Sequence, residues 1–186
     1  MKWVPGLFSV FVLTVLGVLL LQGEASFPYA EGEHGITVHM KLERSDYELG
    51  ESIPLQAFLT NGGSYTIRVW PSLFSLELLW KKNRNEQIKY HAPLSGSDIT
   101  QSTSREVGPG QTLELALYAD PDDLAEVGIE HPGNYVAGLR YQGTLTAVFE
   151  ENGEKQNRAW LPVLKSGSQK IRLMPPGALG DHDGPR

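Results

Sequence analysis

The sequence predicts an all-β fold, an antiparallel β-sandwich with one short crossing helix. Apolar and polar residues alternate with period two along most of the chain after residue 35, which is the pattern of strands that bury one face. Gly, Pro and Asn turn signals separate these runs at short intervals, as in antiparallel sandwiches. Helix-start chemistry occurs in one short segment, 120–126. These observations favour two packed antiparallel sheets.

The first residues are predicted to direct export. Lys2 precedes an apolar run from Leu7 to Leu21, and 23–25 is Gly-Glu-Ala, with small residues where a signal peptidase cleaves. We therefore expect residues 1–25 to be a signal peptide and the mature chain to be secreted or periplasmic. The alternative is an uncleaved membrane anchor, because residues 3–21 approach the ~20 apolar residues of a spanning helix. A membrane partner is expected only in that case.

Composition excludes several classes of chemistry. The chain has no cysteine, so disulfides, thiol catalysis and cysteine–zinc sites are excluded. Its formal net charge is −6, from 16 Lys and Arg against 22 Asp and Glu, and phosphate binding needs clustered cations. The basic run 81–84 is interpreted as a solvated hairpin tip. We expect no nucleic-acid partner.

The strands of the predicted domain, 36–174, follow a linker at 26–35. In the first strand Ile36, Val38, Met40 and Leu42 share one face. A second strand covers 53–59 and ends at the turn Asn61-Gly62-Gly63. A third begins at 65–70, is interrupted by Pro71-Ser72 and resumes at 74–80. The polar residues 81–85 predict a hairpin that leads into 87–91.

The second half is expected to begin with a long Ser/Thr-rich loop, 92–106, holding at most one edge strand. A strand at 112–117 follows the turn Gly108-Pro109-Gly110. In the helical segment, Asp120 is expected to cap and Pro121 to occupy the first turn. Strands at 135–141, 145–149, 158–164 and 170–173 bring the total to eight or nine, and Asn152-Gly153 predicts a tight hairpin. Residues 175–186 are expected to be a disordered tail.

The predicted core is one set of large side chains on the alternating faces. Its members are Val38, Met40, Leu42, Leu55, Leu59, Leu76, Leu78, Leu113, Leu115, Leu117, Tyr135 and Leu139.

The order of these motifs resembles that of bacterial immunoglobulin-like domains, in particular the intracellular proteinase inhibitor family. The likeness rests on Tyr-Glu-Leu-Gly-Glu at 47–51, a strand ending in Asn61, Pro-Gly before a Leu-rich strand at 109–117, and Pro-Gly-Asn-Tyr at 132–135. It covers about residues 41–141 and implies an immunoglobulin-like sandwich in which Tyr135 forms a tyrosine corner. The export signal and the C-terminal extension depart from the family. No inhibitory residue can be carried over.

Catalytic, cofactor and metal sites are not expected. The five histidines lack the spacing of a His-rich metal site, and Asp120, Asp122 and Asp123 are interpreted as helix-capping residues rather than calcium ligands. The segments 31–34 and 181–183 are poor metal sites because binding would have to order them. No paired carboxylates, nucleophile elbow or phosphate loop stands out. We therefore predict a non-enzyme.

Aromatic residues are the remaining candidates for a binding site. Trp80 falls on the core face by alternation, whereas Trp70 is out of phase with Ile67 and Val69. Exposed Trp and Tyr stack on sugars or anchor peptides. The tentative binding residues are Trp70, Trp160, Tyr65 and Tyr90.

The favoured function is a non-catalytic binding or accessory module that recognises another protein at the cell envelope or outside the cell. Such folds present loops and sheet edges to partners. Proteinase inhibition is a special case that the family resemblance implies. The alternative from another class is a carbohydrate-binding sandwich that uses exposed tryptophans, with a glycan as its partner.

Overall fold

The computed structural model describes residues 35–83, 86–97, 99, 103–151 and 154–179. The chain divides into two compact units, Met1–Ala30 and Glu31–Arg186, and every described residue belongs to the second. The predicted signal peptide, the linker before Gly35, the Asn152-Gly153 turn, Arg84, and the segments 31–34 and 181–183 lie outside the described residues.

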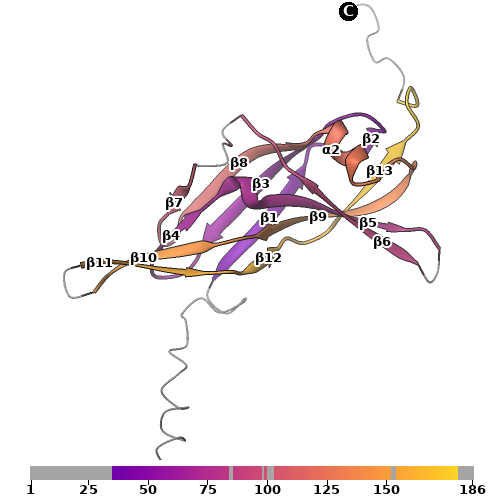
Figure 1. Ribbon diagram of the computed structural model, residues 1–186. Coiled ribbons are helices and arrows are strands. Elements are labelled where there is room, and N and C mark those ends of the chain that lie inside the picture. Colours follow the sequence, from indigo (N-terminus) through magenta and orange to yellow (C-terminus); the bar gives the residue numbers. More distant parts are fainter. Residues whose placement is uncertain (1–34, 84–85, 98, 100–102, 152–153, 180–186) are drawn as a thin grey trace, which may run out of the picture. The chain divides into compact units, whose positions relative to one another are not determined.

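Thirteen strands in three sheets make up the described part of the chain (Figure 1). The three-stranded sheet has the order β1 (Ile36–Leu42), β3 (Ile53–Asn61), β8 (Thr112–Ala119). The six-stranded sheet has the order β2 (Asp46–Glu48), β13 (Gln169–Met174), β9 (Gly133–Gln142), β5 (Phe74–Lys81), β6 (Gln87–Pro93), and β12 (Val163–Lys165) also pairs with β9. The four-stranded sheet has the order β11 (Glu154–Trp160), β10 (Leu145–Glu151), β4 (Thr66–Val69), β7 (Arg105–Val107).

This architecture confirms the predicted all-β, immunoglobulin-like sandwich. Almost every strand pair is antiparallel, and the exception is β2 beside β13. The described residues hold more strands than the eight or nine expected, because three-residue strands such as β2 and β12 are too short to show alternation. The expected edge strand in the loop 92–106 is β7, at the edge of the four-stranded sheet.

The core lies between the buried faces of the sheets. Eleven of the twelve predicted core residues are buried, from Leu76 and Leu78 at 0% exposed to Leu42 at 9%. The prediction was wrong for Leu113, which is half-buried. It lies one residue from the start of β8, and β8 is an edge strand of its sheet. Alternation assigned its face correctly but could not show that the sheet ends there.

The crossing helix forms as expected. The helix α2 (Pro121–Glu126) has Asp120 as its N-cap, whose Oδ1 accepts a hydrogen bond from the Asp122 amide at 3.0 Å. Pro121 occupies the first turn, where its missing N–H costs nothing. A 3-10 turn, η1 (Pro71–Leu73), separates β4 from β5 at the predicted interruption.

Two buried polar side chains fix the loops. The Tyr135 hydroxyl donates to the His131 carbonyl at 2.8 Å, which confirms the expected tyrosine corner. Asn61 is 0% exposed, and its Nδ2 donates to the carbonyls of Tyr65 and Val107, both at 2.8 Å. Its Oδ1 accepts from the Gly63 amide at 3.0 Å. Asn61 therefore ties the end of β3 to the loop before β4 and to the last residue of β7.

The last five strands form one long two-stranded ribbon. The chain runs out along β9 and β10 and returns along β11, β12 and β13, so that β10 pairs with β11, and β9 pairs with β12 and then with β13. Lys165 pairs with Arg140 and Gln169 with Ala137, so three residues, 166–168, face two residues of β9, 138–139. This extra residue is a β-bulge, and it interrupts the ribbon in the middle of the six-stranded sheet.

Beyond β13 the chain continues in contact with the sheet. The Glu48 carboxylate accepts hydrogen bonds from the amides of Gly177 and Leu179, at 2.8 and 2.7 Å. The beginning of the expected disordered tail, 175–179, is thus a turn fastened to β2. Residues 180–186 lie outside the described residues.

Candidate functional site

The site is the outer face of the six-stranded sheet, meaning the side turned away from the core. On β9, Tyr135, Ala137, Leu139 and Tyr141 are buried, whereas the three residues between them are half-buried. Cross-strand partners share a face, so the register extends the outer face over β5, β6, β12, β13 and β2.

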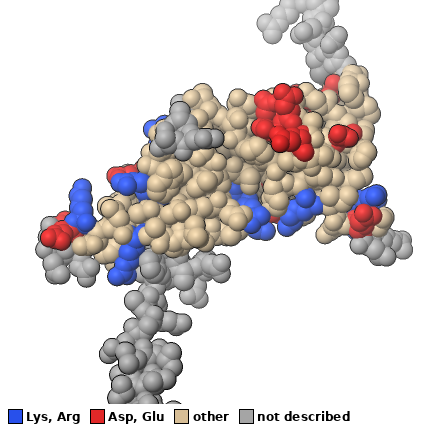
Figure 2. Space-filling view, viewed as in Figure 1, with Lys and Arg blue, Asp and Glu red and all other residues tan. Residues whose placement is uncertain are grey.

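Cations outnumber carboxylates on this outer face, although the chain as a whole is acidic. In Figure 2, Lys and Arg side chains gather along the lower edge of the sandwich, apart from a group of Asp and Glu above. By register, the cations of the face are Lys81, Lys89, Arg140, Lys165, Lys170 and Arg172, and its carboxylates are Asp46, Glu48 and Glu77.

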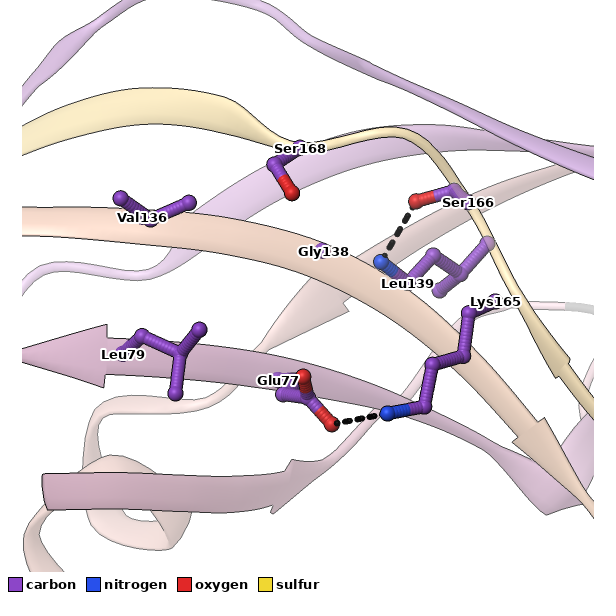
Figure 3. A pocket seen from close by; sticks show the side chains of 8 residues that line it. All are labelled: Glu77, Leu79, Val136, Gly138, Leu139, Lys165, Ser166 and Ser168. Carbon is purple, nitrogen blue, oxygen red and sulfur yellow. Dashed lines mark hydrogen bonds and ion pairs between the residues drawn. The ribbon is translucent and has the colours of Figure 1, made fainter. Parts of the chain in front are cut away.

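Glu77 is the centre of this charge cluster. Its side chain is only 13% exposed, and its carboxylate oxygens lie 3.5 Å from Lys89 Nζ and 3.5 Å from Lys165 Nζ. Figure 3 shows the Lys165 side chain reaching across β9 towards Glu77 on β5. Burial by itself raises the pKa of Glu77, but the charges of Lys165 and Lys89 outweigh it and hold that pKa below its usual value.

His91 and Arg140 extend the cluster across β6 and β9. His91 Nδ1 is 4.0 Å from Glu77 Oε2, and His91 Nε2 is 3.3 Å from Arg140 Nη1. A guanidinium only donates, so Nε2 accepts this bond and the ring proton sits on Nδ1. Burial and the nearby Arg140 charge lower the pKa of His91, against the opposing effect of Glu77.

Two buried atoms of the cluster have no hydrogen bond. They are Glu77 Oε2 and Arg140 Nε, the buried side-chain atoms in this condition among the described residues. Buried polar atoms are almost always paired. Glu77 Oε2 keeps its ion-pair contact with Lys165 Nζ at 3.5 Å, and both atoms belong to one small region of one sheet face.

A shallow recess lies beside Glu77, over Gly138. Its volume is about 80 Å³, and Leu79, Val136, Lys165 and Ser168 are among its lining residues (Figure 3). Gly138 forms the floor, since a Cβ added there would meet nothing within 4 Å. The Ser166 hydroxyl accepts from the Leu139 amide at 2.8 Å, which fixes the bulge at its rim. The recess is far smaller than the ~300–1,000 Å³ of small-molecule sites.

The tentative aromatic residues do not form one site. Trp160 pairs with Leu145, and Leu145 is buried on the same side of its sheet as Ile67 and Val69. Trp70 follows Val69 in an extended conformation, with φ −106° and ψ 106°, so it points to the opposite side. Both indoles are half-buried. They cannot provide the single stacking platform that the carbohydrate hypothesis needs.

The two tyrosines lie in different surroundings. Tyr65 is 37% exposed, and its ring centroid is 5.7 Å from that of Phe149 on β10. Tyr90, on β6, is half-buried and lies 6.4 Å from the ring of Tyr135. Trp80 stacks on the same Tyr135 ring at 6.1 Å and is half-buried at the end of the core face. Tyr90 therefore packs over the end of the core.

The outer-face cluster is the site that sequence reasoning missed. Glu77 belongs to the polar face of the strand predicted at 74–80, and alternation along one strand gives it no partner. The hairpin predicted at 81–85 could have indicated a neighbour for Glu77, because its position sets Glu77 opposite His91 on the next strand. No comparable signal points to Lys165, which belongs to a distant strand.

Two other kinds of feature are absent from the described ranges. No group of three or more His, Asp or Glu side chains is arranged to hold a metal ion there. No helix in these ranges is long and apolar enough to cross a membrane.

Comparison with known proteins assigns no family. No family model and no curated protein matches the chain. The DNA glycosylase AlkC of Pseudomonas fluorescens is 15% identical with a TM-score of 0.43, and the match covers 84% of this chain and 33% of that one. The β-glucosidase EmGH1 of Erythrobacter marinus is 13% identical with a TM-score of 0.40, over 80% of this chain and 16% of that one.

The fimbrial subunit AggA of Escherichia coli is 14% identical with a TM-score of 0.35, over 79% of this chain and 98% of that one. The chain thus spans a third of the length of the glycosylase and less of the glucosidase. Likenesses of this size assign no function.

Proposed function

We propose that this chain is an exported, non-catalytic binding module that recognises another protein through the outer face of its six-stranded sheet. The observation that carries the proposal is the charge of this face, on which, among the described residues, six cations outnumber three carboxylates. Charged groups arranged on one face steer and orient a partner of complementary charge. The surface of another protein would supply the opposite charges.

The dimensions of the face favour a protein over a small molecule. The recess of about 80 Å³ cannot enclose a drug-sized ligand, whereas a broad sheet face offers area for a protein interface. The titratable groups of the cluster are paired with one another rather than aimed at a nucleophile. These features support binding without catalysis.

Site-specific photo-crosslinking tests the proposal. A benzophenone side chain placed at Ser168, beside the recess, should yield a discrete adduct with a protein from envelope extracts, and excess unmodified protein should compete it away. The control position is Glu114, exposed on the three-stranded sheet. The proposal is wrong if Ser168 gives no competed adduct, or if Glu114 gives the same one.

Export is part of the proposal and has its own measurement. Expression in a bacterial host should release a protein whose N-terminus is near Ser26, because 23–25 has the form of a cleavage site. Intact mass and N-terminal sequencing determine where the chain begins. Recovery of the full-length chain from the membrane fraction alone would identify the first segment as an anchor.

Proteinase inhibition remains a special case of the proposal, supported by the family resemblance alone. The test is a panel of secreted proteases assayed with increasing amounts of the purified chain. Inhibition that rises with chain concentration would support it. Cleavage within the folded domain without inhibition would eliminate it and leave the wider binding function in place.

A further inference from the structure

We infer that the partner contributes an acidic, extended segment that lies across the outer face, and that one of its carboxylates enters the recess over Gly138 between Lys165 and Ser168. This inference rests on the function proposed above and names the chemistry of the partner.

Charge complementarity is the first argument. The carboxylates of the face are already engaged within the chain: Asp46 pairs with Arg172 at 2.6 Å, Glu48 accepts from two amides of the C-terminal turn, and Glu77 lies between two lysines. The cations of the face remain in excess, and Lys165 is half exposed. An acidic segment would balance this excess, and charge-assisted bonds are the stronger hydrogen bonds.

The shape of the recess is the second argument. The bulge at 166–168 and the missing side chain of Gly138 leave a hollow in a sheet face that side chains would otherwise cover. About 80 Å³ is room for a few water-sized groups, which suits a carboxylate. Lys165, Ser168 and Glu77 line the hollow. Lys165 and Ser168 are hydrogen-bond donors, and Lys89, 3.5 Å from Glu77, balances the charge of that carboxylate.

The remaining side chains of the face favour a peptide over a nucleic acid or a membrane. Single-stranded nucleic acids stack their bases on aromatic rings, and the described strand positions of the outer face carry no Phe, Tyr or Trp. Membrane-surface binding inserts exposed apolar side chains. On this face Leu79 and Val136 beside the recess are half-buried, and Val163 at the start of β12 is 40% exposed. An extended acidic peptide matches the charge of the face.

The test is fluorescence anisotropy with a labelled peptide of alternating Glu and Ser. Lys165→Glu should weaken binding about tenfold or more, as expected for loss of a charge-assisted contact. Gly138→Val should abolish binding, because its Cβ has no heavy atom within 4 Å and its two methyl groups extend into the hollow. Its thermal midpoint is measured beside that of the unaltered chain, so that loss of binding is separated from loss of folding. Lys155→Glu, the same charge change on exposed β11, is the control and should change affinity less than about twofold.

Each possible failure has a distinct meaning. An unbound acidic peptide, together with a competed crosslink from Ser168, would overturn this inference and spare the proposed function. Binding that survives Gly138→Val but not Lys165→Glu would overturn the placement of a partner carboxylate in the recess. If Lys155→Glu lowered the affinity as much as Lys165→Glu, the peptide would be responding to net charge rather than to the recess, and the inference would be wrong. Tighter binding to thymidine oligonucleotides or phosphatidylglycerol vesicles than to the peptide would replace the acidic segment with those partners.

Discussion

Replacing Asn61 with alanine is expected to lower the free energy of unfolding by about 2–5 kcal/mol. The side chain is 0% exposed and makes three hydrogen bonds, to the carbonyls of Tyr65 and Val107 and from the amide of Gly63. The bond to Val107 is fully buried, so its carbonyl would lose its side-chain donor away from water. The other two groups are partly buried and would recover hydrogen bonds from solvent, which keeps the total below three full penalties of ~1–3 kcal/mol.

Urea denaturation followed by far-ultraviolet circular dichroism measures this loss. The matched control is the neighbouring Thr60→Ala, which removes an exposed hydrogen bond to the Thr112 hydroxyl at 2.9 Å. An exposed bond of this kind contributes about 0.5–1.5 kcal/mol at most. Asn61→Asp should be at least as harmful as Asn61→Ala, because it would set a carboxylate oxygen against two carbonyl oxygens.

The reasoning would be refuted if Asn61→Ala cost no more than Thr60→Ala. That result would mean that water replaces the amide without penalty, so that the loops around β3 and β7 are held by their backbone contacts. The Gly110 amide does donate to the Asn61 carbonyl at 2.7 Å, and this bond survives the substitution. The comparison therefore isolates the side chain.

Three further predictions, each with its own substitution, test the core and the cluster. Tyr135→Phe removes the tyrosine-corner bond and should cost about 1–3 kcal/mol in urea denaturation; an unchanged midpoint would count against the corner. Leu115→Ala should cost about 2–5 kcal/mol and the half-buried Leu113→Ala clearly less, whereas equal costs would contradict the burial of β8. The pKa of His91 is lowered in the folded chain, so the unfolded chain binds the proton first and stability falls as the pH drops through about 6.5 and below. His91→Gln should flatten stability between about pH 7 and 5; a profile changed no more than by His39→Gln would show that His91 does not contribute.

The sequence was sufficient for the local features of this fold. The alternation in β1 and β3 assigned their buried faces, since side chains of a strand point to opposite sides in turn. The cap at Asp120 and the turn at Asn61 were readable because a side chain that bonds to a backbone a few residues away needs no information from the rest of the chain. The Tyr135 corner belongs to the same class, because its acceptor is four residues upstream.

Only the tertiary structure decided which outward residues meet. Alternation shows that Glu77 points away from the core, but not that β9 brings β5 and β12 to its two sides. The recess over Gly138 could not be predicted from one strand alone. The bulge at its rim is a mismatch in the number of residues between two paired strands, so it shows only when their pairing is known. Likewise, the opposite directions of Trp70 and Trp160 follow from sheet order and register. Strand periodicity determines the side on which a residue lies, whereas long-range pairing, which periodicity does not encode, determines its neighbours.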